Sequence, residues 1–313
     1  MTMNFHHIPV LFDEVMEWMN PQPDGIYADG TLGGGGHSAM ICSKLNEKGT
    51  LVGTDRDTVA LQAAGERLKT FSCNKHLVHS NFFAIKEVLA KLQIAGIDGA
   101  ILDLGVSSPQ LDDAERGFSY NMTARLDMRM DRDATLDAWQ VVNTYPEERL
   151  ADIIFRYGEE RYARRIAAAI VATRKDKPIE TTTELSEIIK RTFPAAQRYA
   201  DKHPAKRTFQ AIRIEVNQEL EGLDAAIRDF VQVLNKGGRL AIITFQSLED
   251  RIVKNVFADL AKGCECPKDF PVCVCGKKPQ VKLITKKPVV AGETELNENN
   301  RAHSAKLRVI EKL

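Results

Sequence analysis

A glycine-rich segment near the N-terminus constrains the fold of this chain more than any other feature. Residues 29–37 read DGTLGGGGH, follow the short apolar run 25–28 and precede a helix-like run over 38–45. Glycine lets the backbone turn with positive φ and approach a ligand closely. The N–H groups at the start of the following helix can bind a ligand's polar atoms. The order of strand, glycine turn and helix therefore predicts a cofactor loop. A flexible turn without function is the weaker interpretation.

The residues around the glycines indicate which cofactor such a loop would hold. Gly36 is not followed by the Lys of a phosphate-binding loop, and a dinucleotide fingerprint fits only loosely at Gly30. Asp29 would repel a pyrophosphate but would attract a cationic group. The pattern therefore favours S-adenosylmethionine, which carries both an ammonium and a sulfonium.

Two further acids follow predicted strands. Asp55 ends a second apolar run and lies 19 residues after Gly36. That is close to the spacing of about 20 at which an acid binds ribose hydroxyls in nucleotide-binding βαβ units. Asp57 is the alternative ribose ligand, although it fits better as the N-cap of a helix over 58–68. Asp103 ends a third strand. Because ligands bind at the carboxyl ends of strands in an open parallel sheet, we expect these acids and the glycines at one edge.

Length and composition indicate an ordinary globular protein of about two domains. The chain has 313 residues, 43% hydrophobic and 27% charged, with a formal net charge of zero. The N-terminus lacks a signal-peptide pattern, and no apolar run approaches membrane-spanning length. We therefore expect a cytoplasmic protein with no membrane partner, in which cysteines are reduced thiols or metal ligands.

The type of secondary structure that the sequence predicts changes twice along the chain. Strand and helix signals alternate up to about Leu104 and resume after Arg207, which predicts a doubly wound α/β domain. Between these points we expect a helical insert, with helices over 134–143, 146–157, 160–174 and 183–193. After the insert we expect one long helix over 207–234, a turn at 235–238, strands over 239–245 and 306–310, and a long, partly mobile loop over 262–300.

The predicted insert carries a local excess of positive charge. Residues 161–207 contain 12 Lys and Arg against 5 Asp and Glu. Arg161, Arg164 and Arg165 share one helical face by their spacing. A single arginine is most simply a solvated side chain, but the cluster favours contact with RNA phosphates.

Four of the six cysteines form two C-x-C pairs, Cys264-x-Cys266 and Cys273-x-Cys275. Four thiolates can bind tetrahedral zinc, yet the commoner zinc pattern is C-x-x-C. Zinc binding and reduced thiols in a loop both stay open, and no metal ligand is assigned.

A set of short motifs extends over almost the whole chain. They lie at 7–11, 29–37, 103–113, 116–119, 126–130, 157–161, 203–205, 207–211, 247–251 and 304–308. The most specific is DLGVSSPQLDDAERGFS, beginning at Asp103. The set resembles the MraW family of methyltransferases, which modify cytosine N4 in 16S rRNA. One departure is Gln246, where the family usually has His, so an obligatory catalytic imidazole is in doubt there.

The resemblance implies a fold, a reaction and a site. The fold would be a class I S-adenosylmethionine-dependent methyltransferase domain, α/β and Rossmann-like, over 1–112 and 208–313, with an all-helical insert over 113–207 that recognises rRNA. The reaction would be methyl transfer from S-adenosylmethionine to the exocyclic N4 of a cytidine in the decoding region of 16S rRNA, within the small ribosomal subunit. The cofactor-binding residues carried over are Gly35, Gly36, His37, Asp55, Phe82, Asp103 and Gln110.

The residues themselves leave several of these roles open. Phe82 can stack on an adenine or pack in the core, and His37 can contact the ligand or serve equally well as a helix-capping or packing residue. Asp103 is the candidate catalytic residue, because an acceptor for the N4 hydrogens would make that nitrogen more nucleophilic. The backbone carbonyls of the turn over 104–109 are alternative acceptors. Ser107 and Ser108 can also accept these hydrogens, or they are ordinary turn hydroxyls.

Two functions of other classes remain as alternatives. A nucleotide-binding oxidoreductase would share the α/β architecture but would need a better dinucleotide fingerprint. A non-enzymatic RNA-binding assembly factor would have a vestigial cofactor site, against which the intact Asp29, Asp55 and Asp103 argue.

Overall fold

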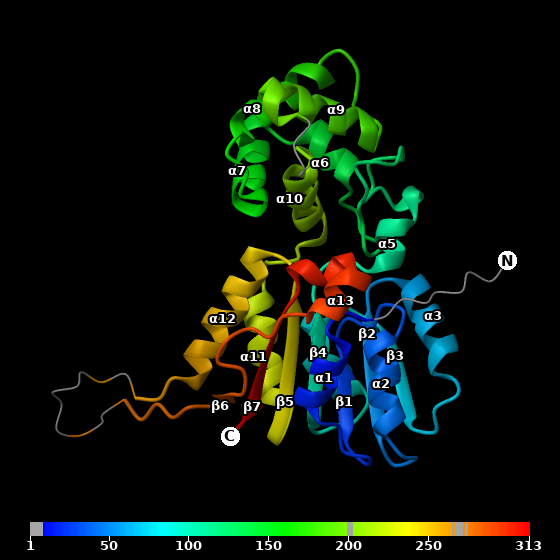
Figure 1. Ribbon diagram of the computed structural model, residues 1–313, viewed down its shortest axis with the longest axis vertical. Helices are drawn as coiled ribbons and strands as arrows, with labels where there is room; N and C mark the ends of the chain where they lie inside the picture. The colour runs from blue at the N-terminus through cyan, green and yellow to red at the C-terminus, as the bar shows by residue number, and fades with distance from the viewer. Residues whose placement is uncertain (1–8, 199–202, 265, 267–271, 273–274) are drawn as a thin grey trace. The chain divides into compact units, whose positions relative to one another are not determined.

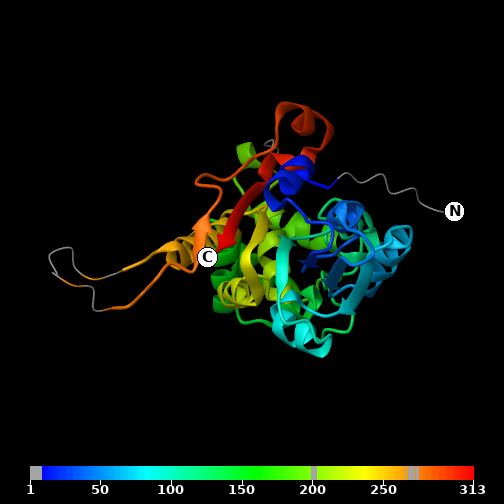
Figure 2. The same cartoon turned by 90° about the horizontal axis from the view of Figure 1, so that it is seen from below.

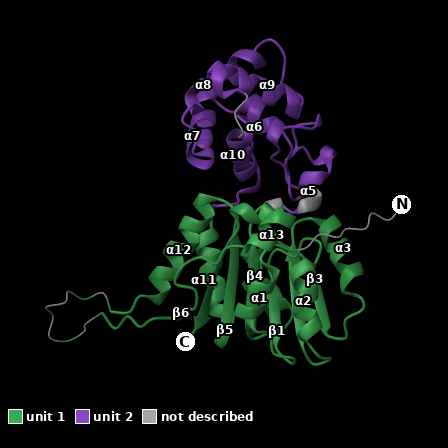
Figure 3. Ribbon diagram, viewed as in Figure 1, with its two compact units in different colours: residues 1–105, 221–313 green, residues 106–220 purple. Residues whose placement is uncertain are grey.

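The computed structural model describes residues 9–198, 203–264, 266, 272 and 275–313. The chain divides into two units, which Figure 3 shows in different colours. Unit 1 comprises residues 1–105 and 221–313, and unit 2 comprises residues 106–220. The predicted insert, 113–207, lies inside unit 2, which is longer at both ends. The reason is packing, since Leu111 on one side and Phe209 and Val216 on the other join the helical core of unit 2.

Unit 1 is built on a seven-stranded sheet with the order β3-β2-β1-β4-β5-β7-β6 (Figure 1). The strands β1 to β5 run parallel, and β7 is antiparallel to both of its neighbours. This topology confirms the predicted Rossmann-like class I fold. The strands are β1 (Ile26–Asp29), β2 (Thr50–Asp55), β3 (Asn74–His79), β4 (Ile97–Asp103), β5 (Leu234–Thr244), β6 (Val281–Leu283) and β7 (Lys306–Lys312).

Helices cover both faces of this sheet, which is why the central strands are continuous apolar runs. The helices α1 (Phe12–Met19), α2 (Gly36–Lys44) and α3 (Thr58–Leu68) share one hydrophobic cluster with the sheet. On the opposite face lie α4 (Ile85–Lys91), α11 (Leu223–Val233) and α12 (Ser247–Ala261), as Figure 2 shows. Shorter elements are η1 (Phe82–Ala84), α13 (Glu293–Glu298) and η4 (Asn300–Ser304). No helix in the described part of the chain has the length and apolar character needed to cross a membrane.

Three local expectations for the second half of the chain need correction. The single helix expected over 207–234 is two helices, α10 (Lys206–Asn217) and α11, because Gln218 and Gly222 adopt positive φ angles of 50° and 83°. The loop expected over 262–300 contains β6 and α13. The turn expected at 235–238 lies within β5, as an irregularity in its pairing with β4.

Unit 2 is helical, as its amphipathic patterns predict. The four predicted helices correspond to α6 (Ala138–Thr144), α7 (Glu147–Gly158), α8 (Ala163–Arg174) and α9 (Thr182–Thr192), and α10 packs with them around one apolar core. Capping boxes begin α6 at Asp137 and α9 at Thr181. Shorter elements are α5 (Ser108–Asp112), η2 (Ala114–Arg116) and η3 (Ala195–Gln197).

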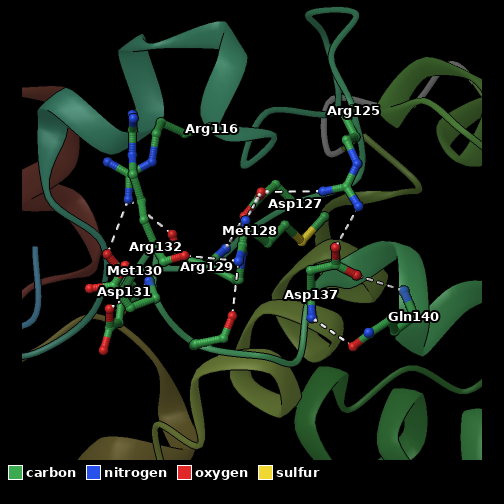
Figure 4. A network of polar contacts seen from close by, with 12 residues as sticks. Arg116, Arg125, Asp127, Met128, Arg129, Met130, Asp131, Arg132, Asp137 and Gln140 are labelled. Carbon is green, nitrogen blue, oxygen red and sulfur yellow. Dashed lines mark hydrogen bonds and ion pairs between the residues drawn. The ribbon is translucent and has the colours of Figure 1, made fainter.

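A network of arginines and aspartates fixes the irregular segment between η2 and α6 (Figure 4). Arg129 binds Asp127 through two hydrogen bonds of 2.9 and 2.8 Å, and these contacts hold the pKa of Asp127 below its usual value despite partial burial. Arg125 donates to Asp137 over 2.6 Å, and Arg116 donates to two backbone carbonyls. The motif at 126–130 therefore has a structural role in unit 2.

Candidate functional site

Three acidic residues end three neighbouring strands of unit 1. Asp29 ends β1, Asp55 ends β2 and Asp103 ends β4. In the sheet, β1 lies between β2 and β4, and the direction in which the chain adds strands reverses between β1 and β4. Open α/β sheets bind ligands at such a switch point. The structure therefore brings together the three acids that the sequence analysis selected.

Hydrogen bonds fix the glycine loop to β2 and β4. The N–H of Gly33 donates to Oδ2 of Asp55 over 2.7 Å, and the N–H of Asp103 donates to Oγ1 of Thr31 over 2.6 Å. The N–H of Gly30 donates to a backbone carbonyl of β4 over 3.0 Å. The loop is therefore a rigid part of the site, although nothing in the sequence pattern singled out Thr31.

The glycines of the loop have different surroundings. A Cβ atom on Gly35, which has a φ of 73°, would lie 3.1 Å from Ala64, and one on Gly36 would lie 2.6 Å from Pro9. A Cβ atom on Gly34 would meet no atom of the described residues within 4 Å. Close packing thus explains why Gly35 and Gly36 lack side chains, and their contact with a cofactor stays a prediction. Gly34 borders open space in which a ligand can lie.

Asp29 is buried, with 2% of its surface exposed. The hydroxyl of Ser38 donates to Oδ2 over 2.7 Å, and the N–H of Thr31 donates to Oδ1 over 3.1 Å. Burial raises the pKa of Asp29 to about 6, and these hydrogen bonds oppose that rise. Asp29 therefore binds Thr31 at one end of the glycine loop and Ser38 at the other. The sequence analysis did not identify Ser38 or Thr31 as its partners.

Asp103 is the most strongly perturbed acid of the site. Burial, followed by the negative charges of Asp29 and Glu249, raises its pKa to about 8. The side chain as a whole is 30% exposed, but Oδ1 is inaccessible to solvent and has no hydrogen-bond partner among the described residues. A buried acceptor without a donor costs roughly 1–3 kcal/mol. Oδ1 of Asp103 is thus an acceptor that a ligand's donor or cationic group can satisfy.

His37 lies beside Asp103 at the start of α2. Its Nε2 is 3.0 Å from the carbonyl oxygen of Val10, and its Nδ1 is 3.8 Å from Oδ2 of Asp103. Because a carbonyl only accepts, Nε2 carries a proton. In the neutral ring Nδ1 then presents a lone pair to Asp103, an arrangement that suits a protonated Asp103.

Asp55 is held by the backbone on both of its oxygens. Oδ2 accepts from Gly33, and Oδ1 accepts from the N–H of Asp57 over 2.8 Å. Burial raises the pKa of Asp55. Each carboxylate oxygen can accept two hydrogen bonds, so ribose hydroxyls can still bind. Asp57 accepts from the N–H of Val59 and caps α3, which confirms the preferred interpretation of that residue.

Phe82 and Gln110 contribute less to the described geometry. Phe82 begins η1, is 8% exposed and contacts Phe83 edge to face at 4.7 Å between ring centroids. Its surroundings are those of a core residue, and stacking on adenine stays a prediction. Gln110 is buried in unit 2, where its Oε1 accepts from the N–H of Ser107 over 3.2 Å. The side chain of Ser108 lies outside the described residues.

Glu249 is a buried acid that sequence reasoning assigned no role. It is 2% exposed near the start of α12, where Oε1 accepts from the side chain of Gln246 over 2.8 Å and Oε2 accepts from the N–H of Phe245 over 3.0 Å. Gln246 and Glu249 form the capping box of α12. The glutamine therefore fills a structural position, and the charge of Glu249 contributes to the raised pKa of Asp103. The sequence signal that could have identified Glu249 is the motif at 247–251, which contains it.

The arginines predicted to face RNA do not share one helical face. Arg161 precedes α8 and donates to Gln197 over 3.4 Å. Arg164 and Arg165 are exposed in the first turn of α8, and no ion pair involves them within the described part of the chain. Positive charges at a helix N-terminus oppose the helix dipole, so this pair does not serve the stability of α8.

Comparison with known proteins gives a consistent result over the whole length. The model of the MraW methylase family matches residues 4–313. A ribosomal RNA small subunit methyltransferase H from Brevibacillus brevis is 55% identical over 312 residues, which cover 100% of this chain and 99% of that protein. Proteins of the same name from Clostridium botulinum and Heliobacterium modesticaldum are 56% and 54% identical, and each alignment covers 99% of this chain and 100% of the relative.

Proposed function

Because the chain belongs to the MraW methylase family, we propose that it transfers a methyl group from S-adenosylmethionine to the exocyclic N4 of a cytidine in the decoding region of 16S rRNA. The names of its relatives support a small-subunit rRNA substrate. The observation that carries the proposal is the buried Oδ1 of Asp103, which has no hydrogen-bond partner among the described residues and lies in a cluster of acids at the strand ends.

The residues present fit a cationic cofactor. Burial raises the pKa values of Asp29, Asp55 and Asp103. The charge of Asp55 raises the pKa of Asp29 further, and the charges of Asp29 and Glu249 raise that of Asp103. A ligand with an ammonium and a sulfonium would relieve this repulsion, whereas the pyrophosphate of a dinucleotide would add to it. Gly34 leaves room beside the loop for such a ligand. The site therefore supports a methyltransferase over an oxidoreductase.

The chain's own groups have two tasks in the reaction. Bound S-adenosylmethionine supplies a methyl group on a sulfonium, a good leaving group, so the protein mainly has to align donor and acceptor. Asp103 accepts a hydrogen bond from the N4 amino group and draws its lone pair out of conjugation with the ring. When N4 gains the methyl group it must lose a proton. Asp103 can hold that proton, and His37 at 3.8 Å supports the protonated form.

Unit 2 offers a surface for the rRNA. Some of its basic side chains are used internally, since Arg174 and Arg198 each donate to two backbone carbonyls. Arg164, Arg165 and Lys175 are exposed and have no ion pair among the described residues. These three side chains are among the candidates for phosphate contacts, which set affinity and salt dependence but not sequence choice.

The test is methylation of isolated small ribosomal subunits, followed by nucleoside mass spectrometry and a single-turnover rate. The wild-type enzyme should form N4-methylcytidine at one site. Asp103→Asn should keep its fold and lose rate, because an amide accepts hydrogen bonds more weakly than a carboxylate. Asp224→Asn, an exposed position on α11, is the matched control and should keep the full rate. A different methylated nucleoside, or a normal rate for Asp103→Asn, would contradict the proposal.

A further inference from the structure

The segment between α12 and β6 brings cysteines from two arms together. Cys264 and Cys266 lie on the arm that leaves α12, and Cys275 lies on the arm that returns to β6. Their three Sγ atoms all lie within 4.8 Å of one another. In Figures 1 and 2 the two arms extend side by side away from the sheet. Cys273 of the second C-x-C pair lies outside the described residues.

The distances match a metal site better than a disulfide. The Sγ atoms of Cys264 and Cys275 are 3.7 Å apart, whereas the two sulfurs of a disulfide are about 2.05 Å apart. Four thiolates placed tetrahedrally about 2.3 Å from a zinc ion stand about 3.8 Å from each other. The observed separation of the two sulfurs is therefore that of neighbouring ligands on one zinc ion.

A backbone contact supports the thiolate form of one of these cysteines. The N–H of Cys266 donates to Sγ of Cys264 over 3.4 Å. Such donors orient a ligating thiolate and offset part of its negative charge. The C-x-C spacing is uncommon among zinc sites. Here it places the backbone N–H of Cys266 against the Sγ atom of Cys264.

The two arms are held together next to α12 and β6, but beyond that point they bury few apolar side chains. The N–H of Gln280 donates to the carbonyl of Leu260 over 2.9 Å, and Lys277 pairs with Asp259 over 3.1 Å. Farther out, Cys264 and Cys275 are exposed, and Val272 is 69% exposed. Small segments without a core are often held by a metal, because metal binding supplies folding free energy.

We propose that Cys264, Cys266 and Cys275 bind one Zn²⁺ ion that fixes the segment between α12 and β6. A tetrahedral zinc ion has one further coordination position beyond these three thiolates. Thiolates select zinc over hard cations such as Mg²⁺, and a closed set of thiolates is typical of structural zinc. The site stands apart from the acids of the methyl-transfer site and serves structure.

The first test measures metal in the full-length protein, purified without a metal-affinity tag and under reducing conditions. Wild-type protein reconstituted with Zn²⁺ and desalted should retain about one zinc ion per chain by mass spectrometry. The double variant Cys264→Ser/Cys275→Ser should retain none. Cys42→Ala, which removes a buried thiol from α2, is the control and should retain zinc. Co²⁺ in place of Zn²⁺ should give thiolate charge-transfer absorption only in the wild type and the control.

A second measurement reports on the segment itself. Trypsin should cleave after Lys277 or Lys278 at least several-fold faster in the double variant, or after chelation, than in the zinc-loaded wild type. Circular dichroism should show the same helix content in both. The proposal is wrong if the wild type binds no zinc, if the double variant binds as much, or if the bound metal is an iron–sulfur cluster.

Discussion

Binding of S-adenosylmethionine should release close to one proton at pH 7, and Asp103 is the source. With a pKa of about 8 in the cofactor-free site, Asp103 is about 90% protonated at pH 7, whereas Asp29, with a pKa of about 6, is about 10% protonated. A cation next to Asp103 favours its charged form. Ionising this group at pH 7 costs about 1.4 kcal/mol, or tenfold in affinity.

The sign of the pH dependence follows from that proton. Affinity for the cofactor should rise about tenfold per pH unit up to pH 8 and level off above it. Titration calorimetry at pH 7, in buffers of different ionisation enthalpy, should report a release of about 0.9 proton. Asp103→Asn should reduce the release to the small share of Asp29, and Asp224→Asn should leave it unchanged.

Two outcomes would refute this reasoning. A binding enthalpy that is the same in every buffer would mean that no proton leaves. An affinity that stays constant between pH 6 and 8 would mean that Asp103 is already ionised or does not meet the cofactor. The cofactor-free protein offers an independent check. The raised pKa means that the folded state holds an extra proton, so stability falls as pH rises from about 4 to 8. Asp103→Asn should therefore raise the unfolding free energy at pH 8, by at most about 5 kcal/mol.

Three further predictions test other parts of the site. Asp55→Ala should weaken cofactor binding by roughly 1.5–3 kcal/mol in calorimetry, the scale of hydrogen bonds to a charged group, and unchanged affinity would remove Asp55 from the ribose role. Gly34→Ala should keep the melting temperature but weaken cofactor binding, because the added Cβ enters the space beside the loop. Gly30→Ala should instead lower the free energy of unfolding by about 1–3 kcal/mol, because the added Cβ would lie 2.3 Å from Leu102. If Gly34→Ala lowered stability and Gly30→Ala did not, the described packing would be contradicted. Arg164→Gln/Arg165→Gln should flatten the logarithmic salt slope of RNA binding by about 0.7–0.9 per lost phosphate contact without changing cofactor affinity, and an unchanged slope would place the RNA surface elsewhere.

The strand ends were predictable because their signals are local. An apolar run followed at once by an acid or by glycines marks the carboxyl end of a buried strand, and Asp29, Asp55 and Asp103 all follow that rule. Parallel strands then bring these ends to one edge, whatever the rest of the chain does. The cap at Asp57 was predictable for the same reason, since a cap depends on its nearest neighbours in sequence.

Other features depend on contacts between distant segments. The break between α10 and α11 was missed because the apolar periodicity continues on both sides of it, and only the positive φ angles at Gln218 and Gly222 reveal it. Gly35 and Gly36 match a family motif for cofactor binding, yet their immediate neighbours are Ala64 and Pro9.

The sequence by itself determined the alternation of strands and helices, the helical interruption and the acids that end three strands. It did not decide whether the cysteines bind zinc, because their spacing in sequence does not show which thiols lie close together. Only the tertiary structure decided that Cys275 lies 3.7 Å from Cys264, and that Glu249 adds its charge to the environment of Asp103. The physical reason is that propensity and capping act over a few residues of chain, whereas electrostatic shifts and metal geometry depend on distances through space.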